Sequence, residues 1–185
     1  PFFRFPTTPI AYFPPSNVMR ITVSASVFVP KSHTPFQWAA QLDKETVQRR
    51  QKMLKAEISK LKGVDFKYHE SDVSYIEAVF ARGDRRCAEV LARASELGCE
   101  FDGWTEFYDN DKWTQAFRDT GIDPNFYALR ERDIDEVLPW AHLDCGVSME
   151  FLKREWEHAQ KAEITHDCRK GCVGCGMKRY EGACR

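Results

Sequence analysis

The sequence lacks any apolar run of the ~20 residues that a transmembrane helix needs, so it predicts no helical membrane span. It also lacks a net charge of either sign, since 27 basic residues face 28 acidic ones. A protein near neutrality gives no bulk electrostatic reason for binding nucleic acid or an anionic membrane. The opening segment has several prolines and no basic-then-apolar order, which is not typical of a signal peptide. We therefore expect a cytoplasmic protein.

The remaining composition is that of a globular protein. Of the 185 residues, 43% are hydrophobic and 30% are charged, which excludes a disordered chain. Residues 1–18 differ from the rest, being rich in proline and phenylalanine and without a starting methionine. We expect either a fragment of a longer protein or a natural start at Met19.

The first periodic segment is a strand. Residues 21–29 are mostly β-branched or apolar, and Pro30 ends the run. A nearly continuous apolar strand is typical of a buried parallel sheet. One strand cannot form a sheet, so we expect its partners in a missing upstream segment or in another chain.

The polar loop that follows, residues 31–38, is a candidate ligand site. Loops at the carboxyl ends of strands hold ligands in α/β folds, which makes Ser26, Lys31 and His33 candidate cofactor-binding residues. The alternative, which we favour on sequence alone, is that Phe36 and Trp38 cover the core and His33 is solvated.

Most of the chain beyond residue 38 predicts short helices. Asp43 caps a helix that runs to about Lys62, and residues 64–69 alternate as a short strand. Further helices are expected from a capping box at Ser74 to Arg82, from Asp84 to Gly98, from Asp109 or Asn110 to Gly121, from Asp123-Pro124, from Asp133 to Pro139, and from Ser148. The fold class is therefore α+β and predominantly helical.

Three arginines gather at one predicted helix start. Arg82, Arg85 and Arg86 flank Gly83-Asp84 and are candidate anion-binding residues, because helix amino termini attract anions. The alternative, which we favour at least equally, is that Arg82 or Arg85 pairs with acidic residues of the following segment, residues 100–109.

The carboxyl-terminal tail carries the clearest chemistry. Cys168, Cys172 and Cys175 have the spacing CxxxCxxC with glycines between them, and Cys184 follows. Short glycine-containing loops let thiolates converge on one ion or cluster. The total of seven cysteines is odd, and four of them lie in the tail, which favours a metal over disulfides. The sequence predicts zinc or an iron-sulfur cluster, with Cys184, His166 or Cys145 as possible fourth ligand and Cys184 preferred.

The other cysteines are predicted to be structural. Cys87 and Cys99 fit small core positions. Cys145 lies close to His142 and Asp144, so a Cys/His nucleophile is conceivable. We prefer packing of Cys145 against the tail or the core, because no third orienting group is evident.

Several motifs together resemble the carboxyl-terminal part of bacterial cobalamin-binding radical S-adenosylmethionine (SAM) proteins. They occur in the family's order and are ITVSASVFVPKSHTPFQW (21–38), ARGDRR (81–86), FDGWTE (101–106), DPNFY (123–127), LPWAHLDCGV (138–147) and the tail 167–176. The terminal CxxxCxxC does not have the position of the family's catalytic motif. Residues 179–185 match the family pattern poorly.

The resemblance implies an incomplete enzyme of unknown substrate and unknown catalytic residues. Residues 19–63 would be the last strand, loop and helix of a partial TIM-type barrel, residues 64–162 a helical appendage, and residues 163–185 a metal-binding tail. The catalytic [4Fe-4S] cluster, SAM and cobalamin would belong to a missing upstream barrel and cobalamin domain. The alternative is a zinc-knuckle module without enzymatic activity, whose Arg82–Arg86 junction contacts a phosphate-bearing partner such as RNA.

Overall fold

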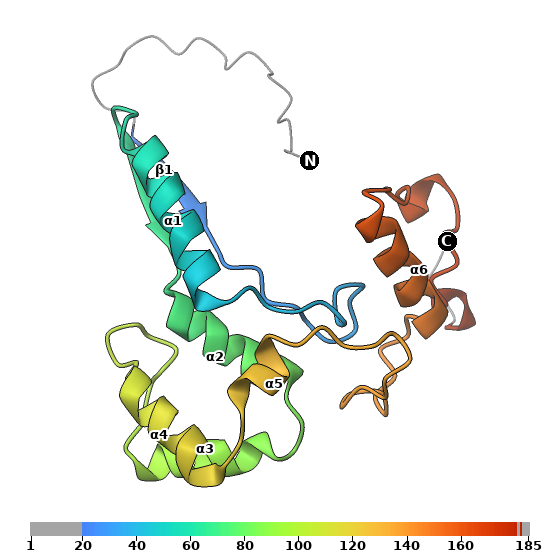
Figure 1. The fold of residues 1–185 in the computed structure, drawn as a ribbon. Helices are drawn as coiled ribbons and strands as arrows, with labels where there is room; N and C mark the ends of the chain where they lie inside the picture. Colours follow the sequence, from blue (N-terminus) through green and yellow to red (C-terminus); the bar gives the residue numbers. More distant parts are fainter. Residues whose placement is uncertain (1–19, 181, 183–185) are drawn as a thin grey trace.

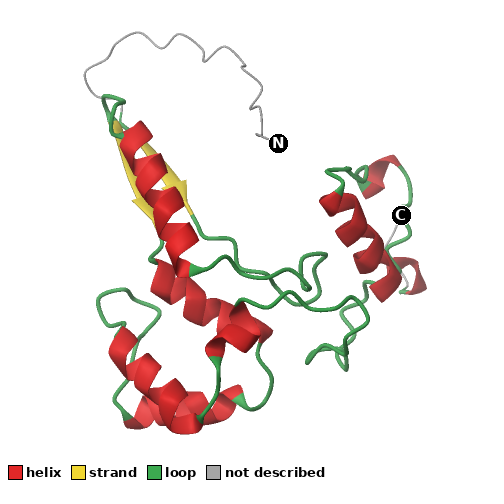
Figure 2. Cartoon of the chain, in the orientation of Figure 1, coloured by secondary structure: helices red, strands yellow, loops and turns green. Residues whose placement is uncertain are grey.

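A computed structural model describes residues 20–180 and 182 of the protein. Within these residues the fold is mixed α/β and mostly helical, with a two-stranded sheet (Figure 2). The predicted Pro- and Phe-rich segment, residues 1–18, and Cys184 lie outside the described residues.

The sheet and its crossover helix form one βαβ unit. Strand β1 (Ile21–Ala25) pairs in parallel with β2 (Val64–Tyr68), in the register Ile21 to Val64 and Ala25 to Tyr68. Helix α1 (Lys44–Ile58) supplies the crossover that a parallel pair requires and lies along the strands (Figure 1). Asp43 caps it as predicted, accepting a hydrogen bond from the Thr46 N–H at 2.7 Å.

The predictions for the first strand are only partly confirmed. Its pairing is parallel, but the partner is β2, downstream in the same chain, so the expectation of partners only upstream or in another chain is wrong. The strand ends at Ala25, four residues before the predicted Val29, and it is not buried, since Ile21 is 49% and Val23 37% exposed. The apolar sequence predicts that these residues can be buried. In the described structure, however, the neighbouring residues cover little of their surface.

Four helices build the main core. They are α2 (Ser71–Arg82), α3 (Cys87–Glu96), α4 (Asn110–Thr120) and α5 (Pro124–Ala128). Their buried apolar side chains form one core cluster, which includes Ala78, Val79, Val90 and Ala116. Cys87 is buried in this cluster and half-buried Cys99 packs against it, as predicted. We call this set of four helices the helical core.

The caps of α4 and α5 are confirmed. The Asp109 carboxylate accepts from the Asp111 and Lys112 N–H groups, and the Asp123 carboxylate accepts from Asn125. Gly121 ends α4 in a left-handed conformation, with φ of 66°. Local capping chemistry is sufficient to place these two helices.

Three other predicted boundaries are wrong. Helix α1 ends at Ile58 rather than near Lys62. Helix α2 begins at Ser71, so Ser74 lies within its first turns instead of capping it, and α3 begins at Cys87, with Asp84 outside it. No helix forms over residues 133–138, because this segment packs as turns in a second core.

The second core joins the loop after β1 to the last helix. Helix α6 (Met149–Gln160) begins where predicted, with the Ser148 hydroxyl accepting from Phe151 N at 3.2 Å. Leu152 of this helix packs with Trp38, Leu138 and Trp140. Figure 1 shows α6 and the tail apart from the helical core, linked to it through long loops. Trp38 therefore covers a core, as we favoured, whereas Phe36 is 39% exposed and His33 is half-buried rather than fully solvated.

Candidate functional site

The cysteine-rich tail folds against α6. It contains two short 3-10 helices, η1 (Cys168–Lys170) and η2 (Met177–Arg179). One guanidinium nitrogen, Nη2 of Arg154 on α6, donates to the Val173 carbonyl at 2.6 Å, and the Ser148 N–H donates to the Cys175 carbonyl at 2.8 Å. The backbone between the last two described cysteines is thus fixed at both ends of the Val173–Cys175 turn.

The turn from Cys172 to Cys175 has features of a thiolate ligand loop. The Gly174 N–H donates to Cys172 Sγ at 3.4 Å, a contact that stabilises a thiolate and orients it. Gly174 and Gly176 have φ of 71° and 96°, values that favour glycine. Cys172 is exposed and Cys175 is half-buried, so both thiols are accessible.

The third cysteine, Cys168, begins η1. The Asp167 carboxylate accepts from the Arg169 N–H at 2.9 Å and pairs with the Arg169 guanidinium. The Arg169 side chain, followed by its N–H, lowers the pKa of Asp167. This local cap sets the start of η1 and leaves the Cys168 thiol exposed.

The donors fit a soft metal, but the described thiols are not assembled around one. Thiolates suit zinc and iron-sulfur clusters alike. Within residues 20–180 and 182, no three His, Cys, Asp or Glu side chains form a group that could hold a metal ion. Metal ligation by Cys168, Cys172, Cys175 and Cys184 stays a prediction.

The tail is also fastened to the segment 142–147. Nη2 of Arg179 donates to both Asp144 carboxylate oxygens at 2.7 and 2.8 Å, and the Tyr180 hydroxyl donates to Oδ2 at 3.0 Å. The Gly146 N–H, with Tyr180 as the next contributor, lowers the pKa of Asp144. A carboxylate in a loop thereby holds the tail that follows α6.

His33 reaches the same region from the loop after β1. It lines a cavity of about 280 Å³ together with His142, Asp144, Cys145 and Arg179. The backbone of this loop is held by buried Gln37, whose Oε1 accepts from Trp140 Nε1 at 2.7 Å and from the His33 N–H at 3.2 Å. The amide nitrogen of Gln37 lies 3.5 Å from Met149 Sδ. Sequence reasoning missed Gln37, since nothing in a lone glutamine distinguishes it.

The structure does not bring the three candidate cofactor residues together. Ser26 is exposed one residue beyond β1. Lys31 forms an ion pair with Glu77 of α2, whereas His33 faces the cavity near Cys145. Cofactor binding by the three as one set stays a prediction.

The three arginines of the predicted anion site also separate. Arg82 is fully buried, and its guanidinium donates to the carbonyls of Ala128 and Arg130 at 2.8 and 2.7 Å. Burial, followed by repulsion from Arg132 and Arg130, lowers the pKa of Arg82 to about 10. Arg86 pairs with Asp84 at 2.7 Å. Neither Arg82 nor Arg85 forms an ion pair among the described residues, so the predicted pairing of these two with the acidic segment 100–109 is wrong. Arg85 is exposed.

The cavity residues His142 and Cys145 do not form a nucleophile pair. In the described residues no hydrogen bond joins them, and the Cys145 thiol is exposed. Of the two predicted positions for Cys145, packing in the core is wrong, and Cys145 instead lines the cavity that Arg179 of the tail also lines. The segment turns back at Asp144 and Gly146, which directs the chain toward Ser148 and α6.

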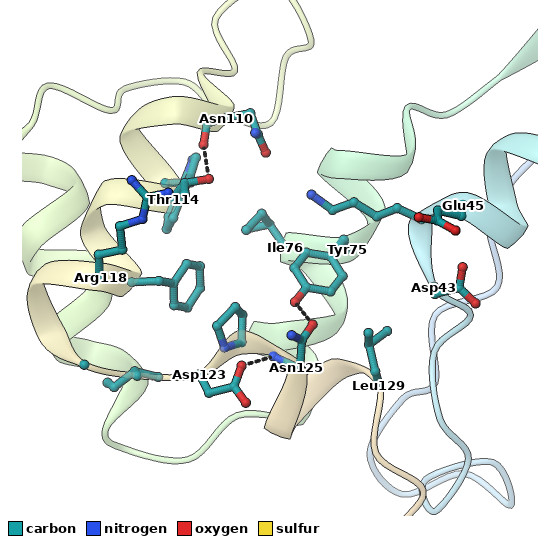
Figure 3. A pocket seen from close by; sticks show the side chains of 16 residues that line it. Asp43, Glu45, Tyr75, Ile76, Asn110, Thr114, Arg118, Asp123, Asn125 and Leu129 are labelled. Atoms are coloured by element: carbon teal, nitrogen blue, oxygen red, sulfur yellow. Dashed lines mark hydrogen bonds between the residues drawn. The ribbon is translucent and has the colours of Figure 1, made fainter.

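The helical core contains a further cavity, of about 740 Å³, that no predicted site residue lines. Figure 3 shows it between α2, α4, α5 and the start of α1. Two hydrogen bonds join polar groups of its lining, since the Tyr75 hydroxyl donates to Asn125 Oδ1 at 2.6 Å and Asn125 N donates to Asp123. Burial, followed by repulsion from Asp123, raises the pKa of Tyr75 to about 12.

No protein-family model, curated protein or solved structure matches this chain. In the part of the chain that the structure describes, no helix combines the length and the apolar character needed to cross a bilayer.

Proposed function

We propose that this chain is the carboxyl-terminal part of a cobalamin-binding radical SAM protein. In this proposal β1 and β2 are the edge of a larger parallel sheet, a partial TIM-type barrel. Cys168, Cys172 and Cys175 hold an accessory iron-sulfur cluster or a zinc ion, with Cys184 as the fourth ligand.

The observation that carries the proposal is the exposed strand of the parallel pair. Parallel sheets are almost always covered on both faces, and a two-stranded sheet is marginal by itself. Ile21 and Val23 are nevertheless exposed, although residues 21–29 have the composition of a buried strand. In a larger sheet with further strands beside β1, the apolar side chains would be covered and the unpaired backbone groups of β1 would form hydrogen bonds.

The tail geometry supports an accessory site. The Gly174 N–H orients the Cys172 thiolate, while Arg154 and the Ser148 N–H hold the backbone on either side. Metal binding is coupled to folding, so ligation would gather the three thiolates around the ion or cluster. A bound iron-sulfur cluster supplies electron transfer, whereas zinc supplies structural stability. Catalytic cleavage of SAM is assigned to the missing barrel.

The alternative of an RNA-binding zinc module has less support. Its proposed contact surface needs free arginines, yet Arg82 is buried on backbone carbonyls and Arg86 is paired with Asp84. Only Arg85 of the three is exposed without an ion pair among the described residues.

Metal analysis of the anaerobically purified protein tests the site. We expect stoichiometric iron with visible absorbance, or stoichiometric zinc without colour, and loss of that metal in Cys172→Ser and Cys175→Ser. Cys99→Ser, half-buried in the helical core, is the matched control and should keep the metal. Absence of both metals in the unmodified protein would overturn the proposed site.

A turnover assay tests whether this chain alone lacks the SAM cleavage that we assign to the barrel. After cluster reconstitution, the chain with dithionite and SAM should release no 5′-deoxyadenosine. Turnover by these residues alone would make the terminal cysteines catalytic and contradict the accessory role. A reading frame directly upstream that encodes CxxxCxxC after a strand would support the missing barrel.

A further inference from the structure

A second cavity of the helical core lies at the carboxyl end of β2. It has a volume of about 590 Å³, within the range of ligand pockets. Residues 68–70, which leave β2, form one wall, and α2, the loop 102–108 and α4 form the others. Carboxyl ends of parallel strands are the usual ligand position in open α/β sheets.

The lining of this cavity is aromatic and acidic. Phe80, Tyr108 and Trp113 provide aromatic surface, and Glu70, Glu77 and Asp102 provide carboxylates. Among the described residues no lysine or arginine lines it, and His69 is the one basic side chain of the lining. Lys31 pairs with Glu77, but no ion pair neutralises Glu70 or Asp102 within residues 20–180 and 182.

Asp102 has an unpaired, buried carboxylate oxygen. No donor among the described residues lies within hydrogen-bond distance of its Oδ1. A carboxylate oxygen without a partner is costly to bury. Burial, followed by the negative charges of Asp72 and Asp102, raises the pKa of Tyr108. The lining of the cavity thus combines the carboxylates of Glu70, Glu77 and Asp102 with aromatic rings, the combination that attracts organic cations.

The loop that forms one wall of the cavity through Asp102, Gly103 and Thr105 also carries exposed aromatic side chains that do not themselves line the cavity, and we call these the aromatic rim. Phe101, Trp104 and Phe107 lie in the loop that closes one wall and are 69%, 63% and 56% exposed. Three large aromatic side chains in one exposed loop are typical of a surface that a macromolecule covers. A small free amine would leave this rim uncovered.

We propose that this cavity binds a lysine or arginine side chain of a partner polypeptide. The aliphatic stem contacts Phe80 and Trp113, and the cationic head pairs with Asp102 and Glu70. The backbone on either side of that residue covers the aromatic rim. The site is separate from the cysteine-rich tail, so it does not depend on the proposed metal.

The test compares three probes on the whole chain by nuclear magnetic resonance of the tryptophan indole N–H groups. The probes are acetyl-Ala-Lys-Ala-amide, the same peptide with norleucine in place of lysine, and n-butylammonium. We expect saturable shifts of the Trp113 and Trp104 resonances with the lysine peptide, and affinity at least roughly fivefold weaker for each of the other two. Equal affinity for the norleucine peptide would refute the cation, and equal affinity for n-butylammonium would refute the polypeptide.

Charge-neutral variants locate the cation. Asp102→Asn keeps the shape of the side chain and should weaken the lysine peptide by roughly fivefold or more. Glu157→Gln, an exposed site on α6, is the matched control and should bind like the original protein. Circular dichroism confirms that both variants fold. Unchanged binding by folded Asp102→Asn would overturn the proposal.

Discussion

Ala78, Val79, Val90 and Ala116 of the helical core are completely buried, whereas neither short helix of the tail, η1 or η2, contains a buried residue. The helical core is stabilised by apolar packing between helices. The tail is stabilised by a few hydrogen bonds to α6, by ion pairs and by glycine turns. This difference indicates that apolar packing of its own side chains stabilises the helical core, whereas the tail depends on polar contacts and turn geometry.

The largest expected effect is a cavity in the core. Phe117→Ala removes a buried ring of α4 and should lower the free energy of unfolding by about 3–5 kcal/mol. Ile164→Ala, 95% exposed before the tail, should change it by less than about 0.5 kcal/mol. Urea denaturation measures both. Similar losses of unfolding free energy in the two variants would contradict the conclusion that apolar packing stabilises the helical core but not the tail.

A smaller effect is expected where α2 meets α3. Gly83→Ala would place its Cβ 2.6 Å from Cys87 Sγ and 2.9 Å from the Val79 carbonyl oxygen. This overpacking should cost about 1–3 kcal/mol. Gly103→Ala, with no atom within 4 Å of its Cβ, is the control and should have the stability of the original protein. A neutral Gly83→Ala would mean that the contact between the helices relaxes freely.

Acid should weaken the same junction modestly. The Arg86 side chain lowers the pKa of Asp84 from 3.8 to about 2. A lowered carboxyl pKa contributes stability that is complete above 3.8 and is lost as the pH falls from 3.8 toward 2. The contribution is on the order of 1 kcal/mol, because Arg86 is largely exposed.

Denaturation at pH 7 and pH 2.5 measures this contribution. Asp84→Asn should reduce the loss between the two pH values, whereas Asp65→Asn, on exposed β2 sequence, should not. An equal pH dependence in both variants would show that Asp84 does not contribute to the loss of stability in acid.

The smallest effect on the core should come from removing the metal that we propose for the tail. A chelator should leave the unfolding free energy of the helical core unchanged and increase tryptic cleavage at Lys170 and Arg179 in the tail. Mass spectrometry identifies the cut sites. A loss of core stability on chelation would show that the two regions fold as one unit.

Capping residues made the starts of α1, α4, α5 and α6 predictable. Asp43, Asp109, Asp123 and Ser148 each accept the backbone hydrogen bonds that their sequence positions predict. Such contacts join neighbours in the sequence, so local chemistry determines them.

The errors came from distant contacts. Arg82 is buried because carbonyl groups 46 and 48 residues further along accept its hydrogen bonds, which no local pattern reveals. Residues 133–138 form turns rather than a helix, since Leu138 packs against Trp38 and Glu136 pairs with Arg130. At the candidate site, the sequence showed the ligand-like spacing of the cysteines, but it did not predict the ion pair between Arg179 of the tail and Asp144.

Gln37 couples the sheet to the tail. Its buried amide contacts three segments, at His33, Trp140 and Met149, and displacing any of them would leave a polar group unpaired in a dry interior. The loop after β1 and the first turn of α6 therefore have to move together. A ligand that shifted this loop would also shift α6, the helix that supports the cysteines. Binding of a ligand next to the sheet would therefore change the positions of the cysteines in the tail.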